Sequence, residues 1–137
     1  KFHPGGALGK RLYLQCGSIA EQNAKPNVLK SSPWKEVILT ITKNRLGATA
    51  VVDENNKVIG IVTDGDIRRM LENHDTFDHL TADQIMGKSP ITVATDIMAT
   101  EVAAIMQEKK ITQIIITQQT IYFGMVHLHD LYKEGIL

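Results

Sequence analysis

The chain has 137 residues, 43% of them hydrophobic, so its length suits one domain with a substantial core. Fifteen basic side chains balance fifteen acidic ones, and this neutral balance argues against a nucleic-acid partner or an anionic membrane surface. Apolar runs such as Ile114-Ile115-Ile116 are far too short to cross a bilayer. A single cysteine, Cys16, excludes an internal disulfide and suits a reducing compartment, so we expect a cytoplasmic protein in which this thiol is passive.

The first segment in chain order, 1–18, is predicted to be a linker. It opens with "KFHPGGALGKRL", in which Pro4-Gly5-Gly6 disfavours regular structure. The chain starts without a methionine or a targeting pattern, so we expect it to be a piece of a longer protein. Gly9-Lys10 is only superficially like a phosphate-binding loop, because Arg11 stands where that motif requires Ser or Thr.

The next stretch of chain is predicted to form a helix, two strands and a second helix. Pro33 suits the first turn of a helix that Ser32 can cap, and apolar residues recur along it at Val37, Ile38, Ile41 and Leu46. A strand over 49–52, the turn "DENNK" and a strand over 58–63 form a hairpin. The second helix, 66–73, begins with an acidic residue at its positive end.

The same pattern returns in the second part of the chain. "GIVTDGDI", which starts at Gly60, is echoed by "GMVHLHDL", which starts 64 residues later at Gly124. Upstream, "VILTITKNRLGATAVV" is matched at a spacing of 65 by "VAAIMQEKKITQIIIT", so the single gap falls in the turn. The second copy is predicted to open a helix near Thr95-Asp96 and to form a strand over 113–116.

Two copies of short strands alternating with helices predict an α/β (α+β) fold. Each repeat supplies a small sheet with two helices, and neither repeat is long enough to bury a sufficient core alone. We therefore expect the two repeats to pack against each other as a pseudo-twofold pair.

The junction between second strand and second helix carries the candidate binding residues. It offers free backbone N–H groups, the hydroxyl of Thr63 and the carboxylate of Asp66. An aspartate here can accept hydrogen bonds from the vicinal hydroxyls of a ribose, as acidic residues do in other nucleotide folds. Arg68 and Arg69 follow and can meet phosphate. The alternative is that Asp66 only caps the helix, but repetition of the whole pattern favours a binding site.

These two copies, each with a line of the type G-[IV]-V-T-x-x-D, resemble a CBS domain pair, or Bateman module, over Ile19 to Leu137. The resemblance divides the chain into a first repeat, 19–76, and a second repeat, 77–137. It implies that nucleotide-type ligands bind in clefts between the repeats. The candidate ligand-binding residues are Thr63, Asp64, Asp66 and Arg68 in one cleft and His127, His129 and Asp130 in the other.

The second copy departs from the general CBS pattern. His127 replaces the hydroxyl residue, which predicts that the two clefts are not equivalent. Two imidazoles followed by Asp130 also suggest a zinc site. On a strand, however, His127 and His129 would point to opposite faces, so we predict no metal site.

Several longer stretches, together spanning nearly the whole chain, are similar to bacterial D-arabinose-5-phosphate isomerases: "HPGGALGKRL", "LGATAVVDE", "GIVTDGDIRR" and "GMVHLHDLYKEGIL". Enzymes of that family join a sugar-isomerase (SIS) domain to a CBS pair. The resemblance implies a parent enzyme that interconverts D-ribulose 5-phosphate and D-arabinose 5-phosphate for Kdo and lipopolysaccharide or capsule synthesis. It also implies that His3 belongs to the active site of the parent. The catalytic companions of His3 lie in the SIS domain, so we predict that this chain alone is inactive.

The resemblance therefore predicts a regulatory module that requires no cofactor and senses a nucleotide-type ligand, either an adenine nucleotide or CMP-Kdo. Its expected partners are its own SIS domain and a second CBS pair, in a parent enzyme that is a tetramer. The alternative is a module that mainly drives oligomerisation and has no physiological ligand. A free-standing enzyme would need isomerase activity from this chain alone.

Overall fold

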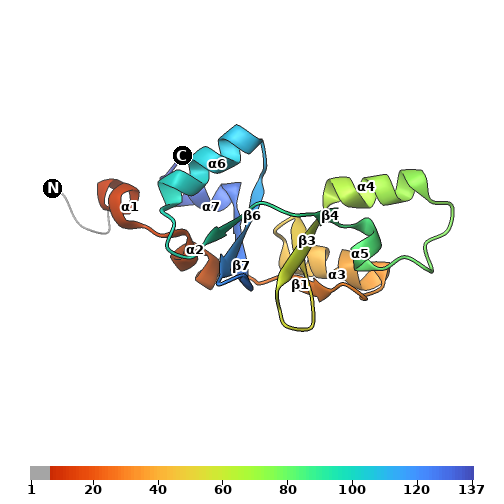
Figure 1. The fold of residues 1–137 in the computed structure, drawn as a ribbon. Helices are drawn as coiled ribbons and strands as arrows, with labels where there is room; N and C mark the ends of the chain where they lie inside the picture. Colours follow the sequence, from red (N-terminus) through yellow and green to blue (C-terminus); the bar gives the residue numbers. More distant parts are fainter. Residues whose placement is uncertain (1–6) are drawn as a thin grey trace.

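The computed structural model of the chain describes residues 7–137 (Figure 1). Its helices are α1 (Ala7–Tyr13), α2 (Cys16–Gln22), α3 (Trp34–Asn44), α4 (Asp64–Asn73), α5 (Ala82–Ile85), α6 (Ala99–Lys109) and α7 (Leu128–Lys133). Its strands are β1 (Asn27–Leu29), β2 (Ala48–Val52), β3 (Val58–Thr63), β4 (Gly87–Lys88), β5 (Thr92–Ala94), β6 (Gln113–Gln118) and β7 (Ile121–His127). Within this described part, no helix is both long and apolar enough to cross a membrane.

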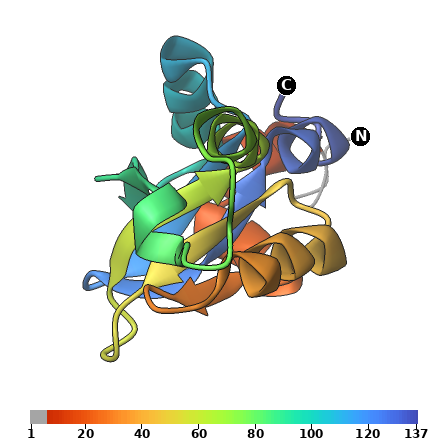
Figure 2. The same cartoon turned by 90° about the vertical axis from the view of Figure 1, so that its right-hand side faces the viewer.

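The strands form two small sheets of the same design. The first has the order β1-β2-β3-β4 and the second the order β5-β6-β7. In each sheet a parallel pair, β1 with β2 and β5 with β6, is joined through a helix, and an antiparallel hairpin follows. Helices α4 and α6 lie above the strands and α3 lies below them in Figure 2. The predicted fold, two small sheets with helices packed as a pair, is confirmed.

A shared apolar layer holds the two sheets together. Strand β2 is buried along its whole length, because Val51 packs into the core of the first repeat while Ala48, Ala50 and Val52 face the second sheet. They meet Ile115, Tyr122 and Met125 there. The hydroxyl of Tyr122 donates a hydrogen bond of 2.8 Å to the carbonyl oxygen of Pro26, which joins the second repeat to the strand β1 region. The expectation that the two repeats pack together is confirmed.

Each repeat is completed by a short helix that precedes the other repeat. Helix α2 contacts β7, and its residues Cys16, Ile19 and Ala20 are part of the core of the second repeat. Helix α5 places Ala82 and Ile85 in the core of the first repeat. Figure 1 shows α2 among the elements of the second repeat and α5 among those of the first. The division into repeats 19–76 and 77–137 stays a prediction. In space, α2 packs with the second repeat and α5 with the first.

Several local expectations need correction. Helix α1 lies within the segment predicted to lack regular structure, because good helix formers follow the glycine pair. Ser32 does not cap α3; its hydroxyl accepts a hydrogen bond from the backbone N–H of Leu29. The helix expected near Thr95 begins only at Ala99, because the carbonyl of Thr95 accepts a hydrogen bond from Gly17 in α2.

Cys16 is fully buried at the start of α2, and its thiol donates to the carbonyl oxygen of Ala94 at 3.1 Å. Burial raises the pKa of the Cys16 thiol to about 11. The side chain therefore remains a neutral thiol at pH 7 and packs as a small apolar residue, as predicted.

Candidate functional site: a cleft between the repeats

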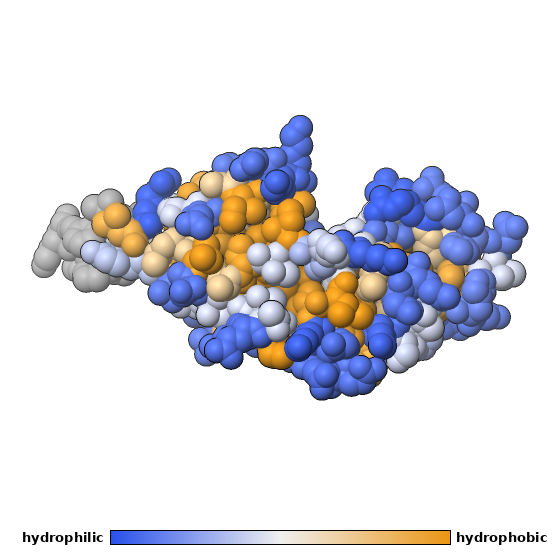
Figure 3. All heavy atoms as spheres, in the orientation of Figure 1, coloured by the Kyte–Doolittle hydropathy of each residue, from blue (hydrophilic) through white to orange (hydrophobic). Residues whose placement is uncertain are grey.

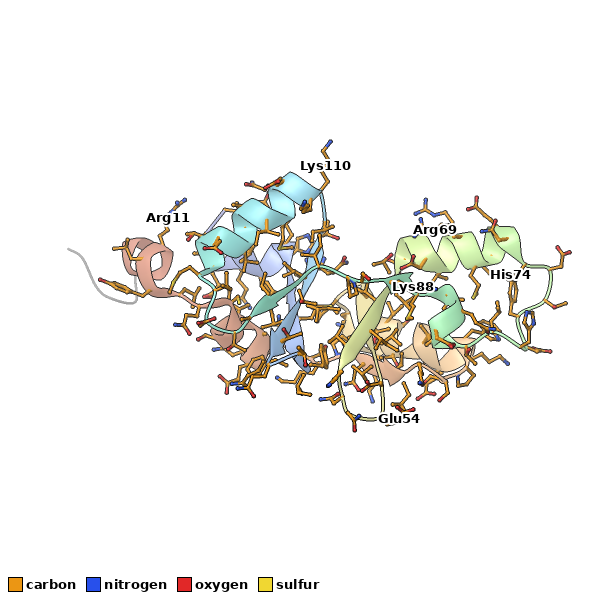
Figure 4. All side chains as sticks on the ribbon, viewed as in Figure 1. Arg11, Glu54, Arg69, His74, Lys88 and Lys110 are labelled. Atoms are coloured by element: carbon orange, nitrogen blue, oxygen red, sulfur yellow. The ribbon has the colours of Figure 1, made fainter. Side chains whose placement is uncertain are left out.

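A cleft of about 510 Å³ opens between the two repeats. Figure 3 shows the surface hollowed between the end of α6 and the start of α4, and Figure 4 shows Lys110 and Arg69 on opposite sides of this hollow. The cleft is lined from the first repeat by Gly47, Ile61, Thr63, Asp64 and Gly65, and from the second repeat by Ser89, Pro90, Ile91, Lys110, Ile111, Thr112 and Gln113. A ligand in this cleft would touch both repeats at once.

The walls of the cleft combine hydroxyls with two opposite charges. Its hydroxyl groups belong to Thr63, Ser89 and Thr112, its carboxylate to Asp64 and its ammonium group to Lys110. Thr63, Asp64 and Gly65 lie where β3 ends and α4 begins, so the backbone N–H groups at the positive end of a ten-residue helix are close by. This arrangement suits a ligand with both hydroxyl and anionic groups.

Asp66 is a helix cap in this structure. Its Oδ2 accepts hydrogen bonds from the Thr63 backbone N–H at 2.9 Å and from the Thr63 hydroxyl at 3.1 Å. Its Oδ1 pairs with the guanidinium of Arg69. The Asp66 backbone N–H in turn donates to Thr63 Oγ1 at 3.4 Å, which completes a capping box. The alternative that Asp66 caps the helix is therefore what the structure shows. A ribose could reach Asp66 Oδ1 only after Arg69 releases it.

Only some of the residues predicted for the first cleft line it. Thr63 and Asp64 line the cleft, whereas Asp66 lines a separate hollow of about 200 Å³ beside α5. Arg68 is exposed on α4 and is not among the residues that line the cleft; Arg69 is the arginine that meets the aspartate. The ligand roles of these residues remain predictions. His3 lies outside the described residues.

The second strand–helix junction has the same capping design with different side chains. The His127 backbone N–H donates to Asp130 Oδ2 at 2.8 Å. The Nδ1 atom of His127 accepts from the His129 backbone N–H at 3.0 Å, so an imidazole takes the place of the Thr63 hydroxyl. Asp130 Oδ2 also accepts a bond of 2.8 Å from the side-chain amide of Asn23.

The prediction that His127 and His129 point to opposite faces is wrong. His127 ends β7, but His129 already lies in the first turn of α7. Their ring centroids are 4.4 Å apart as a result. Among residues 7–137, no three His, Cys, Asp or Glu side chains lie close enough together to hold a metal ion.

His127 predicts a pH-dependent stability. Its pKa is lowered below the ordinary value, first by burial and then by neighbouring His129, while Asp130 acts in the opposite direction. The unfolded chain takes up a proton at this residue near pH 6.5 and the folded chain resists doing so, so the free energy of unfolding falls as the pH drops below about 6.5. A protonated Nδ1 also cannot accept the helix-capping bond.

We expect the Tm of the wild-type chain to fall between pH 7.5 and pH 5.5 by on the order of 2 °C more than that of His127→Thr. Threonine is the capping residue of the first repeat and does not titrate. The other four histidines are present in both chains, so their contributions to the pH dependence cancel in the comparison. Equal pH dependence of the two chains, measured by calorimetry, would contradict the role of this imidazole.

The sequence matches the CBS domain family model over residues 25–73 and 82–136. The chain belongs to the CBS domain family. The two matched segments together cover most of the chain, one in each repeat, so the chain is a CBS pair. The predicted resemblance to a CBS domain pair is confirmed.

Curated relatives extend the similarity over nearly the whole CBS pair. The "Uncharacterized protein RP505" of Rickettsia prowazekii is 37% identical over 135 residues, which are 98% of this chain and 42% of that protein. The arabinose 5-phosphate isomerase KdsD of Escherichia coli K12 is 33% identical over 136 residues, with the same two coverages. This CBS pair therefore spans 42% of the length of these relatives.

Solved structures share the fold of this CBS pair. The acetoin utilization protein AcuB of Vibrio cholerae has a TM-score of 0.80 at 18% identity, covering 90% of this chain and 91% of its own. The CBS domain protein PAE2072 of Pyrobaculum aerophilum, complexed with AMP, has a TM-score of 0.75 at 20% identity, covering 86% and 90%. At these identities the similarity establishes the fold.

Sequence reasoning missed the half of the cleft that the second repeat supplies. Ser89 to Ile91 precede β5, Lys110 to Thr112 join α6 to β6, and Gln113 is the first residue of β6. The repeated sequence could have predicted these residues. In a pseudo-twofold pair, the start of the sheet in one repeat lies against the end of the sheet in the other repeat. Asn23 had no such signal, since an asparagine just after a helix is commonplace.

Proposed function

We propose that this CBS pair senses a nucleotide-type ligand that binds in the cleft between the repeats. The observation that carries the proposal is the cleft, whose volume of about 510 Å³ lies in the range of small-molecule sites and whose lining comes from both repeats. Ile61, Pro90 and Ile91 offer an apolar wall for a base. Thr63, Ser89 and Thr112 offer hydroxyls for sugar and phosphate oxygens.

The charges of the cleft support a nucleotide better than a neutral nucleoside. Lys110 supplies a cation at the rim, opposite the start of α4, and its side chain is exposed and free to move toward a phosphate. We assign Asp64, which lines the cleft, and Asp66 to the ribose hydroxyls; Asp66 lines the neighbouring hollow, so its role requires its side chain to leave Arg69 and turn toward the cleft. The bound AMP of the structurally similar PAE2072 supports the same ligand class.

A ligand that bridges the two repeats would regulate by holding them in one relative position. It can do so only by binding that position more tightly than another. We propose that the regulated activity is the interconversion of D-ribulose 5-phosphate and D-arabinose 5-phosphate in a longer cytoplasmic chain. The name of the KdsD relative, arabinose 5-phosphate isomerase, supports this activity. In that chain His3 joins the active site of an SIS domain, CBS pairs associate as dimers, and the parent enzyme is a tetramer supplying Kdo synthesis.

A melting experiment tests the ligand-sensing function. The chain is heated with AMP, ATP, CMP or CMP-Kdo, and the Tm is recorded as a function of ligand concentration. A nucleotide present at a hundred times its Kd is expected to stabilise the chain by about 2.7 kcal/mol, which raises the Tm by several degrees. Absence of a shift with all four at millimolar concentration would remove the proposal.

The alternative function is oligomerisation without a physiological ligand. It is supported by large apolar side chains that the single chain leaves in solvent, among them Leu39 on α3, which is 68% exposed, and Leu29 on β1, which is 48% exposed. A chain that dimerises in solution and shows no Tm shift in the melting experiment would favour this function over sensing.

A further inference from the structure

The two repeats differ in what occupies the space beside the capping carboxylate. In the second repeat, the side-chain amide of Asn23 donates to Asp130 Oδ2 at 2.8 Å and to the carbonyl oxygen of Met125 at 3.0 Å. Asn23 is the residue that ends α2, the helix that packs on β7. A side chain from outside the second hairpin therefore already satisfies the acceptors that a ligand's hydroxyls would use.

Asn23 has a counterpart in the first cleft. Ala20 lies against Gly124 in the second repeat, and Met86 lies against Gly60, the matching glycine of the first repeat. Ala20 and Met86 therefore hold equivalent positions. Asn23 lies three residues after Ala20, just as Ser89 lies three residues after Met86.

Ser89 lines the cleft of about 510 Å³, and within residues 7–137 no hydrogen bond joins it to Asp66. The first repeat is thus open at the place where the second is filled.

A larger side chain also stands at the second junction, where His127 holds the capping position that Thr63 holds in the first. Its imidazole accepts the N–H bond that caps α7 and lies 4.4 Å, centroid to centroid, from the ring of His129. The hollow beside Asp130 measures about 140 Å³ and the corresponding hollow beside Asp66 about 200 Å³, so the two repeats differ little in these outer hollows and differ in what stands at the junction itself. At the second junction, side chains of the chain itself thus occupy both Asp130 Oδ2 and the position of the Thr63 hydroxyl.

We infer that Asn23 is a built-in occupant of the second cleft, and that this pair binds one nucleotide per chain, in the first cleft. The amide of Asn23 presents N–H donors to Asp130 Oδ2 and to the Met125 carbonyl in the way that ligand hydroxyls would, whereas the partners of Asp66 come from its own strand end and helix, Thr63 and Arg69. The inference rests on the proposed function, because the open cleft must take a nucleotide for the stoichiometry to be one.

Isothermal titration of the chain with AMP tests the inference through stoichiometry. The wild-type chain is expected to bind one AMP. The variant Asn23→Ser/His127→Thr, which gives the second junction the side chains of the first, is expected to bind two. Two AMP molecules on the wild-type chain, or one on a folded variant, would overturn the inference and leave the proposed function intact.

A failure of the proposed function gives a different result. If the wild-type chain binds no AMP but the variant binds one, the first cleft does not sense AMP and Asn23 does close the second cleft. If neither chain binds AMP, both the proposed function and the inference are overturned. The converse variant, Ser89→Asn, covers the case in which the double variant does not fold. Ser89 has φ 51°, which asparagine tolerates, and the variant is expected to weaken AMP binding about tenfold or more. Unchanged affinity would count against the inference.

Discussion

Leucine in place of Gly65 is expected to remove AMP binding while leaving the chain folded. Gly65 lines the cleft in the first turn of α4. A Cβ at this position has its nearest side-chain neighbours, the guanidinium of Arg69 and Thr63 Oγ1, at 3.6 Å, so there is room for a larger side chain, which we expect to extend over the cleft. Leucine also has a higher helix propensity than glycine by roughly 0.7 kcal/mol, so the Tm is expected to stay level or rise.

The binding loss of Gly65→Leu is expected to be about tenfold or more in Kd, measured by titration with AMP. Ala104→Leu is the matched control, because Ala104 is exposed on α6 and is not among the residues lining the cleft. If Gly65→Leu binds AMP as the control does, the nucleotide does not occupy this cleft, and the oligomerisation function becomes the better account of the chain.

Gly65→Leu is a cleaner test than replacement of the aspartates. Asp66 and Asp130 each accept the hydrogen bonds that begin a helix, so alanine at either position removes a cap as well as a candidate ligand contact. Loss of a cap costs on the order of 1 kcal/mol, which mixes folding with binding. Asp66→Asn keeps an acceptor oxygen for Thr63 while removing the charge, and is the better variant at that position.

Local features of the fold were predictable because their signals are local. The strand over 58–63 was predicted with the bounds that the structure gives, since its apolar residues run into a Thr-x-x-Asp cap that stops the strand and starts a helix. The repeat then carried the same elements into the second part of the chain. Membership of the CBS family followed from that repetition, and the family model confirms it.

Features set by packing between distant segments were not predictable in this way. Helix α2 covers the second sheet although it precedes the first repeat, and no periodicity in residues 16–22 indicates which sheet it joins. Lys110 reaches the cleft only because the two repeats face each other. His129 was misplaced for a related reason: a histidine gives no indication of whether a strand has already ended.

The exchange of α2 and α5 between repeats has a thermodynamic consequence: the two repeats are expected to unfold together. Ile114→Ala should therefore lower the stability of the first repeat as well as the second. Ile114 is fully buried in the core of the second repeat, whereas Trp34, the single tryptophan, lies in the first repeat with its ring 5.5 Å from that of Phe77. Fluorescence thus reports on one repeat while the substitution affects the other.

Replacing a buried isoleucine by alanine costs about 2–5 kcal/mol, and we expect the Trp34 transition of Ile114→Ala to shift down by on the order of 10 °C. Ile115→Ala is the matched variant: it removes the same atoms from the next position of β6, which faces the layer shared by both sheets. Cooperative unfolding predicts comparable shifts for both variants and a single transition by fluorescence and circular dichroism. The contrary outcome is a Trp34 transition that shifts with Ile115→Ala but stays at the wild-type temperature with Ile114→Ala. In that case the first repeat keeps its structure alone, and the exchanged helices do not couple the two halves of the cleft.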